Sequence, residues 1–139
     1  MHNLKPTGYP AAASLLLLRI GLAGMWISHG LILKFLTFGI AGLGSWLDSQ
    51  GLPTALALPL ILAEVGGGLL ILAGFHGRWV SLALLPILIG ALLIHAGNGW
   101  VFSNPDGGWE YPLFLTVMTV VHVLLGDGPF ALKTAGAAA

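Results

Sequence analysis

Four apolar segments, each close to the length of a membrane-spanning helix, limit what this chain can fold into. They cover residues 14–35, 54–74, 78–96 and 111–126. A helix needs roughly 20 predominantly apolar residues to cross a hydrocarbon core of about 30 Å. Of the 139 residues, 57% are hydrophobic and only 7% are charged, so lipid must be the solvent for most of the chain. We therefore predict an all-α integral membrane four-helix bundle, with residues 1–139 forming one transmembrane domain.

Charge and cysteine content exclude several classes of function. Five basic and five acidic residues give a formal charge of zero, so the chain has no basic surface to attract nucleic acid. Because there is no cysteine, disulfides, thiolate nucleophiles and cysteine-ligated clusters are excluded. Redox chemistry would therefore require a bound organic or metal cofactor.

The connections between the apolar segments predict an orientation in the membrane. Residues 38–53 and 97–110 are rich in glycine and are predicted to be long loops on one side, whereas residues 74–77 form a tight turn on the other. Basic residues favour the cytoplasmic side. Three of them lie on the turn side and one on the loop side, namely Lys5, Arg78 and Lys133 against Lys34. We expect a multi-pass membrane protein with both termini in the cytoplasm.

Several ionisable residues lie inside the predicted spans, although each costs roughly 2.5 to 3.5 kcal/mol to insert. Glu64 is near the middle of its span, so its carboxyl group must be protonated, hydrated or paired with a cation. We expect Arg19 to be that cation, with His29 or His95 as the alternative, although Arg19 could equally reach the cytoplasmic headgroups. The remaining ionisable residues divide by depth: His29, Lys34, His95 and Glu110 lie toward the outer surface, and Arg19 and His122 toward the inner one.

The outer group is compatible with two kinds of site and with a purely structural role. A histidine and a buried carboxyl group can exchange protons with a reducible ligand such as a quinone. His29, His95, Glu64 and Glu110 have the atom types that bind zinc, iron or copper, although their spacing is not diagnostic and the metal is unknown. Neutral histidines bonded to backbone amides would need no function at all.

A set of short motifs resembles the DoxX-like family of small bacterial membrane proteins. The similarity spans nearly the whole chain in order, and the family pattern implies four transmembrane helices and a location in the bacterial inner (plasma) membrane. The motifs are Leu18-Arg19-Ile20, His29-Gly30, Lys34-Phe35, Gly51-Leu52-Pro53, Glu64-Val65-Gly66-Gly67, Gly74-Phe75 with Arg78, His95, Asn98-Gly99, Asn104, Gly108-Trp109-Glu110-Tyr111-Pro112 and Gly126-Asp127-Gly128.

The resemblance implies a quinone-linked function. The family name derives from a subunit of a thiosulfate:quinone oxidoreductase, and other members are linked to quinone or catechol responses, to redox-stress complexes and to gene clusters for metal-binding peptides. The family's polar motif falls on Arg19, His29, Lys34, Glu64, His95, Asn98, Glu110 and Tyr111, whereas His122 matches no motif.

We therefore expect a quinone-interacting redox protein, either a small oxidoreductase or the membrane subunit of one. The candidate catalytic residues are Glu64, His29 and His95. The candidate cofactor-binding residues are Arg19, Lys34, Asn98, Trp109, Glu110 and Tyr111, with a quinone as the cofactor.

The alternative is a non-enzymatic scaffold, a small-solute carrier or a metal-binding membrane protein. The expected partners are the lipid bilayer, a redox partner protein for electron transfer and, as a further option, other copies of the chain.

Overall fold

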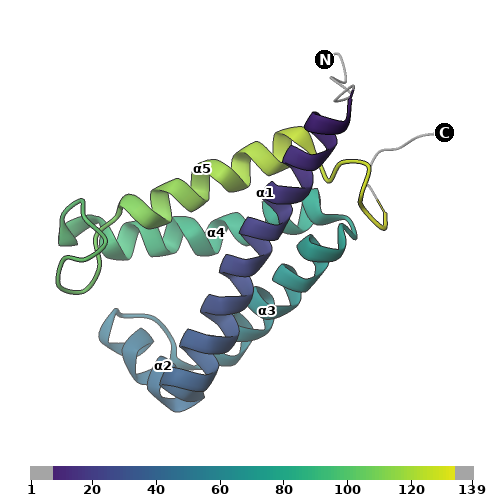
Figure 1. Ribbon diagram of the computed structural model, residues 1–139. Coiled ribbons are helices and arrows are strands. Elements are labelled where there is room, and N and C mark those ends of the chain that lie inside the picture. The colour runs from purple at the N-terminus through teal and green to yellow at the C-terminus, as the bar shows by residue number, and fades with distance from the viewer. Residues whose placement is uncertain (1–7, 134–139) are drawn as a thin grey trace.

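The computed structural model describes residues 8–133, and its regular elements in that range are all helices (Figure 1). A single isolated bridge joins Phe75 to Lys133. The predicted all-α architecture is confirmed. The elements are α1 (Tyr9–Ile27), the π-helical η1 (Ser28–Phe38), α2 (Gly39–Ser49), the 3-10 turn η2 (Thr54–Leu56), α3 (Ala57–Ala73), α4 (Gly77–His95), the 3-10 turn η3 (Ala96–Asn98) and α5 (Glu110–Leu125).

Three helical segments are long and apolar enough to cross a membrane. They are Tyr9–Ser49, Thr54–Ala73 and Gly77–Asn98, and α5 is a fourth apolar helix of shorter length. Large apolar side chains such as Leu62 and Leu93 are exposed on the outside of the bundle, where lipid would cover them. The chain is thus a membrane-embedded helical bundle.

The first segment departs from the prediction at its outer end. The predicted span ended near Phe35 and was followed by a loop over residues 38–53, but residues 39–49 form α2. The loop prediction was wrong there because Leu43 and Leu47 of α2 pack against Ala57 and Ile61, and this tertiary contact outweighs the low helix propensity of three glycines. The chain turns from η1 into α2 at Gly39, whose φ of 71° suits glycine.

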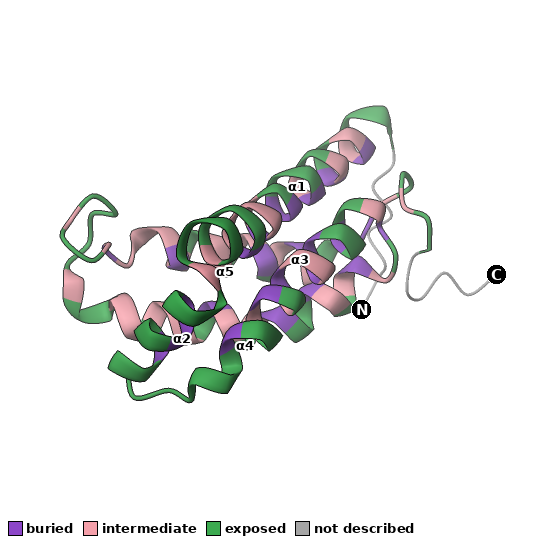
Figure 2. Cartoon of the chain, turned by 90° about the horizontal axis from the view of Figure 1, so that it is seen from below, coloured by how far each residue is buried: buried purple, intermediate pink, exposed green. Residues whose placement is uncertain are grey.

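The described helices form two limbs that join at one end. One limb contains α1, η1, α2 and α3, and the other contains α4 and α5 (Figure 1). The central core is built from α1, α3 and α4, and Figure 2 shows the buried residues on the sides of these helices that face one another. In the described range α2 contacts η1, η2 and α3 but not α4 or α5, so the limbs separate toward α2. The core cluster consists of Leu22, Ala23, Trp26, Ile71, Leu84 and Leu88.

The joined end is closed by buried polar contacts. Arg19 is only 1% exposed, and its guanidinium donates to the carbonyls of Ile71 (3.0 Å) and Leu72 (2.5 Å) at the end of α3, and to those of Asp127 (3.1 Å) and Phe130 (2.9 Å). A cation at a helix C-terminus satisfies orphan carbonyls and complements the helix dipole. Arg19 therefore fastens the segment after α5 to the end of α3.

A second buried network lies beside this arginine. The imidazole of His122 contacts the Ser81 hydroxyl at 2.8 Å through Nδ1 and Asp127 Oδ1 at 3.0 Å through Nε2. Ser81 and His122 are fully buried and Asp127 is 3% exposed. This network ties α4, α5 and the following segment together at the end that holds the described termini.

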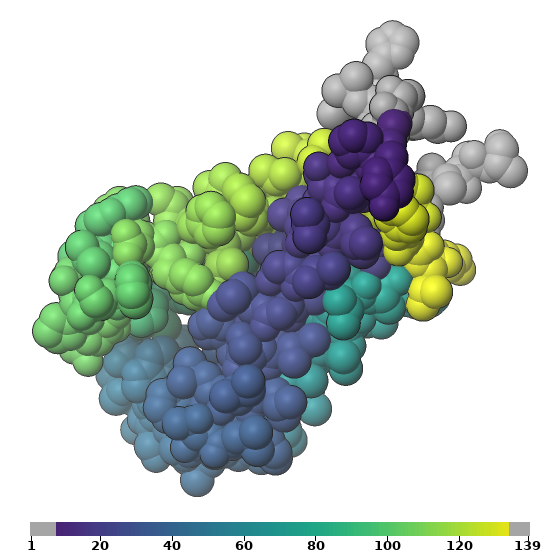
Figure 3. All heavy atoms as spheres, viewed as in Figure 1, coloured from purple at the N-terminus to yellow at the C-terminus, as the bar shows by residue number. Residues whose placement is uncertain are grey.

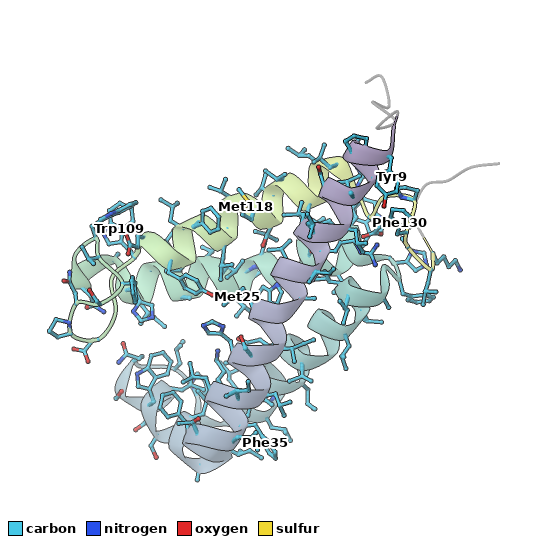
Figure 4. The ribbon with its side chains drawn as sticks, viewed as in Figure 1. Tyr9, Met25, Phe35, Trp109, Met118 and Phe130 are labelled. Atoms are coloured by element: carbon cyan, nitrogen blue, oxygen red, sulfur yellow. The ribbon has the colours of Figure 1, made fainter. Side chains whose placement is uncertain are left out.

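The two connections predicted as long loops do lie at the same end of the bundle, and the turn at Phe75 and His76 lies at the other (Figure 1). Tyr9 and Phe130 also lie at the turn end (Figure 4). This arrangement is the one that the predicted topology requires, although the orientation in the membrane stays a prediction. Lys5, which contributed to the charge argument, lies outside the described residues.

Candidate functional site

A cavity of about 580 Å³ lies between the two limbs, at the end away from Arg19. Figure 3 shows the hollow between α2 and the connection that leads into α5. Its wall is largely apolar and aromatic, with a few ionisable and amide groups. The aromatic and sulfur-containing members are Met25, Trp26, Phe38, Trp46 and Tyr111, and the polar members are His29, Lys34, Gln50, Glu64, His95, Asn98 and Asp106.

Glu64 forms an ion pair with Lys34 in the cavity wall. The Lys34 ammonium lies 2.9 Å from Glu64 Oε2, and the Glu64 side chain is 2% exposed against 19% for Lys34. The prediction that Glu64 is buried and partnered is confirmed. The prediction that Arg19 is its partner was wrong, because the Arg19 guanidinium is fully engaged with carbonyls at the far end.

The π-helical stretch and Gly30 bring Lys34 to Glu64. A Cβ on Gly30 would lie 2.9 Å from both Glu64 Cβ and Val65 Cγ2, so only glycine allows η1 to approach α3 so closely. A π-helical turn is wider than an α-helical turn and changes which side chains face a neighbouring helix. Sequence reasoning treated the first span as a uniform α-helix, so it placed Lys34 at the outer end without a partner.

His29 also lies on η1, one turn before Lys34. Its Nδ1 is 2.9 Å from the carbonyl oxygen of Met25. The imidazole stacks on the ring of Tyr111, with 5.6 Å between ring centroids and 21° between planes. This contact connects the first span to the start of α5, so His29 has a fixed place in the wall.

His95 occupies the opposite wall, at the end of α4. Its Nδ1 is 3.1 Å from the carbonyl oxygen of Gly107, and the Asn98 amide donates to the carbonyl of Asp106 at 3.0 Å. Both contacts hold the connection between α4 and α5 against the cavity. Asn98 and Asp106 of this connection line the cavity.

Trp109 and Glu110 do not line this cavity. The Glu110 carboxylate accepts a hydrogen bond of 2.9 Å from the Phe102 backbone amide, and the Trp109 ring meets Trp100 edge to face at 4.5 Å. Figure 4 shows Trp109 at the start of α5, at the tip of its limb. Both residues shape the connection and do not bound the pocket, contrary to the prediction.

Arg19 was predicted to help bind a cofactor, but it lies at the closed end of the bundle, next to Phe130. The structure thus brings together six of the nine predicted site residues and separates three. Those at the cavity are His29, Lys34, Glu64, His95, Asn98 and Tyr111, and those away from it are Arg19, Trp109 and Glu110.

A family model described as DoxX matches residues 14–97. This match covers more than half of the chain. The chain belongs to the DoxX family. No curated protein and no solved structure matches it. The matched residues run from α1 to the start of the connection after α4 and include His29, Lys34, Glu64 and His95.

In this member of the DoxX family, sequence reasoning missed the part of the site that α2 supplies. Trp46 of α2 lines the cavity, together with Phe38 just before this helix and Gln50 just after it. The signal that could have found this helix was the spacing of Leu43 and Leu47, four residues apart in a glycine-rich segment, which gives a short helix one apolar face.

The arrangement of donor atoms in this DoxX-family chain bears on the metal alternative. Among residues 8–133, no group of three or more histidine, aspartate and glutamate side chains is placed to hold a metal ion. The cavity instead offers paired charges, two imidazoles and flat aromatic walls, which suit a planar organic molecule with polar atoms at its edge.

Proposed function

We propose that this DoxX-family protein binds a quinone ring in the cavity between its limbs and acts as a quinone-interacting redox protein, either alone or as the membrane subunit of an oxidoreductase. The observation that carries the proposal is the Lys34–Glu64 ion pair in the wall of an otherwise apolar and aromatic cavity. A buried ion pair is a poor way to stabilise a membrane bundle, so its presence favours a role in binding.

The size and wall of the cavity support this ligand class. Pockets for small organic ligands commonly have volumes of roughly 300–1,000 Å³ and are mostly apolar with a few placed polar groups. Here the cavity measures about 580 Å³. The rings of Trp26, Trp46 and Tyr111 provide surfaces against which a flat ring can pack.

Lys34 supplies the group that would hold a quinone oxygen. Its ammonium has three hydrogens, and one of them is directed at Glu64. The remaining donors can meet a carbonyl oxygen in the cavity, because the Lys34 side chain keeps 19% of its surface exposed. Glu64 fixes the ammonium in position and compensates its charge.

Electrons must come from or go to another molecule, because the chain has no nucleotide-binding motif and negligible soluble mass. The proposal therefore includes a redox partner protein, whose identity would follow from purification of the intact complex. A scaffold without a quinone would not need the charged pair in the cavity wall.

Quinone binding can be measured directly on the purified protein in lipid nanodiscs. Duroquinone should quench the fluorescence of Trp26 and Trp46 with saturation. The double variant Lys34→Met, Glu64→Gln removes both charges without leaving one unpaired. We expect it to weaken duroquinone binding by about ten- to hundredfold, as for loss of a charged hydrogen bond.

The matched control is Lys133→Met, which removes an exposed lysine at the opposite end of the bundle. Its affinity for duroquinone should equal that of the wild type. Non-saturable quenching in the wild type, or equal affinity in the double variant, would contradict the proposal and favour the scaffold or carrier.

A further inference from the structure

Both histidines in the cavity direct the same ring nitrogen at a backbone carbonyl. His29 Nδ1 contacts the Met25 oxygen at 2.9 Å, and His95 Nδ1 contacts the Gly107 oxygen at 3.1 Å. A carbonyl oxygen can only accept a hydrogen bond, so Nδ1 must carry a hydrogen in each ring. In the neutral imidazole, Nε2 then has a free lone pair.

For His29 the carbonyl partner belongs to the same helical segment. Met25 lies four residues earlier in the chain. In the described structure His29 Nε2 has no hydrogen-bond partner, and His29 lines the cavity. The ring face is occupied by Tyr111, which limits reorientation of the imidazole.

For His95 a second contact must be considered. The Asn98 amide nitrogen lies 3.3 Å from His95 Nδ1, but that amide donates to the Asp106 carbonyl at 3.0 Å. The Asn98 amide has a second hydrogen, but the Gly107 carbonyl is the nearer contact of Nδ1, at 3.1 Å against 3.3 Å. Because that carbonyl has no hydrogen to donate, it determines the protonation of Nδ1. His95 Nε2 is therefore also an acceptor without a protein partner in the described residues.

We propose that, at the quinone site proposed above, the cavity recognises the reduced form of the ligand, a hydroquinone, whose two hydroxyl groups donate hydrogen bonds to Nε2 of His29 and Nε2 of His95. The two histidines come from different limbs, His29 from η1 and His95 from α4. A ring that carries a hydroxyl at each end can contact both walls. A quinone has no hydrogen to donate and would leave both lone pairs without partners.

The other polar groups of the wall determine how strong this preference is. The remaining Lys34 hydrogens can be donated to a quinone carbonyl or to a hydroquinone oxygen, because a hydroxyl group accepts as well as donates. Glu64 adds acceptor capacity, because a carboxylate has two oxygens and Lys34 occupies one. The two imidazole acceptors therefore distinguish the two forms of the ligand, because only the hydroquinone has hydrogens to donate to them.

Three probes with the same tetramethyl ring separate this inference from quinone binding in general. They are duroquinone, duroquinol and 1,4-dimethoxytetramethylbenzene, which keeps the ring and both oxygens but has no hydroxyl hydrogen. With the full chain in lipid nanodiscs under anaerobic conditions, we expect duroquinol to bind at least tenfold more tightly than duroquinone. The dimethyl ether should lose this advantage.

Redox titration gives an independent readout. A tenfold preference for duroquinol raises the midpoint potential of the bound two-electron couple by about 30 mV. Phenylalanine at either histidine keeps a flat ring and removes the acceptor. We expect His29→Phe and His95→Phe each to reduce the preference by roughly two- to tenfold, as for loss of one neutral hydrogen bond.

His76→Phe, in the turn at the far end of the bundle, is the control and should keep the full preference. Equal affinities for duroquinone and duroquinol in the wild type would overturn the inference and leave the proposed function standing. A preference that persists in the His29→Phe, His95→Phe double variant would also overturn it. If none of the three probes binds, both the inference and the proposed function fail. The comparison of duroquinol with the dimethyl ether uses only the wild-type protein, so it tests the inference even if a histidine variant does not fold.

Discussion

Lys34 Nζ lies 2.9 Å from Glu64 Oε2, and this ion pair joins the π-helical part of the first span to the middle of the second. The two partners are not equivalent. The Lys34 side chain is partly exposed to the cavity, whereas the Glu64 side chain is 2% exposed and would stay buried without its partner. Removal of the lysine should therefore cost more stability than removal of the acid.

We expect Lys34→Met to destabilise the protein by about 3 kcal/mol or more, because it leaves a buried carboxylate unpaired. Glu64→Gln should cost less, and the double variant should recover part of the loss. A double-mutant cycle on thermal or denaturant unfolding in detergent measures the coupling. Additive effects of the two substitutions would show that the ion pair does not form.

Gly30→Ala tests the close approach of η1 to α3. The new methyl group would lie 2.9 Å from Glu64 Cβ, so the helices must separate, at a cost of about 1–3 kcal/mol. Gly24→Ala is the matched control, because a methyl group at that position would meet no atom within 4 Å and alanine favours the helix. The measurement is the melting temperature of each variant, and equal values for Gly30→Ala and Gly24→Ala would argue against the close approach of η1 to α3.

Arg19→Lys should loosen the closed end without changing the cavity. A lysine cannot reproduce a guanidinium that donates to four carbonyls on two segments. We expect faster amide hydrogen exchange at residues 130–133 and 73–76, where the chain segments pair. Duroquinone affinity should remain at the wild-type value. A large loss of affinity would instead show that Arg19 contributes to ligand binding, as the sequence predicted.

Topology is tested with single cysteines, which is straightforward because the chain has none of its own. We expect Ser49→Cys and Asp106→Cys to react with an impermeant thiol reagent added to intact cells, and Lys133→Cys to react only after permeabilisation. Labelling of position 133 alone in intact cells would reverse the orientation.

The helices could be predicted from the sequence because membrane spans are specified by length and apolarity alone. The choice of His29, Glu64 and His95 for the site was possible for a related reason, since ionisable groups in lipid need partners or functions. These residues indeed line one cavity.

What could not be predicted depends on contacts between distant segments. The π-helical register of η1 requires the surface of α3, and without it Lys34 cannot be matched to Glu64. Arg19 was assigned to Glu64 because both are ionic, but backbone carbonyls at the end of α3 are equally good partners for a guanidinium. Every residue has a backbone carbonyl, so the sequence does not show which carbonyls will accept hydrogen bonds from an arginine.

The closed end built around Arg19 sets the point about which the two limbs can rotate relative to each other. The two limbs are fixed to each other there and separate toward α2, so any change in the angle between them must pivot near the guanidinium. A helix of about 19 residues is about 28 Å long, and a rotation of roughly 5° therefore moves its far end by about 2 Å. A small adjustment at the pivot would thus change the width of the cavity between the limbs, and with it the distance between His29 on one limb and His95 on the other.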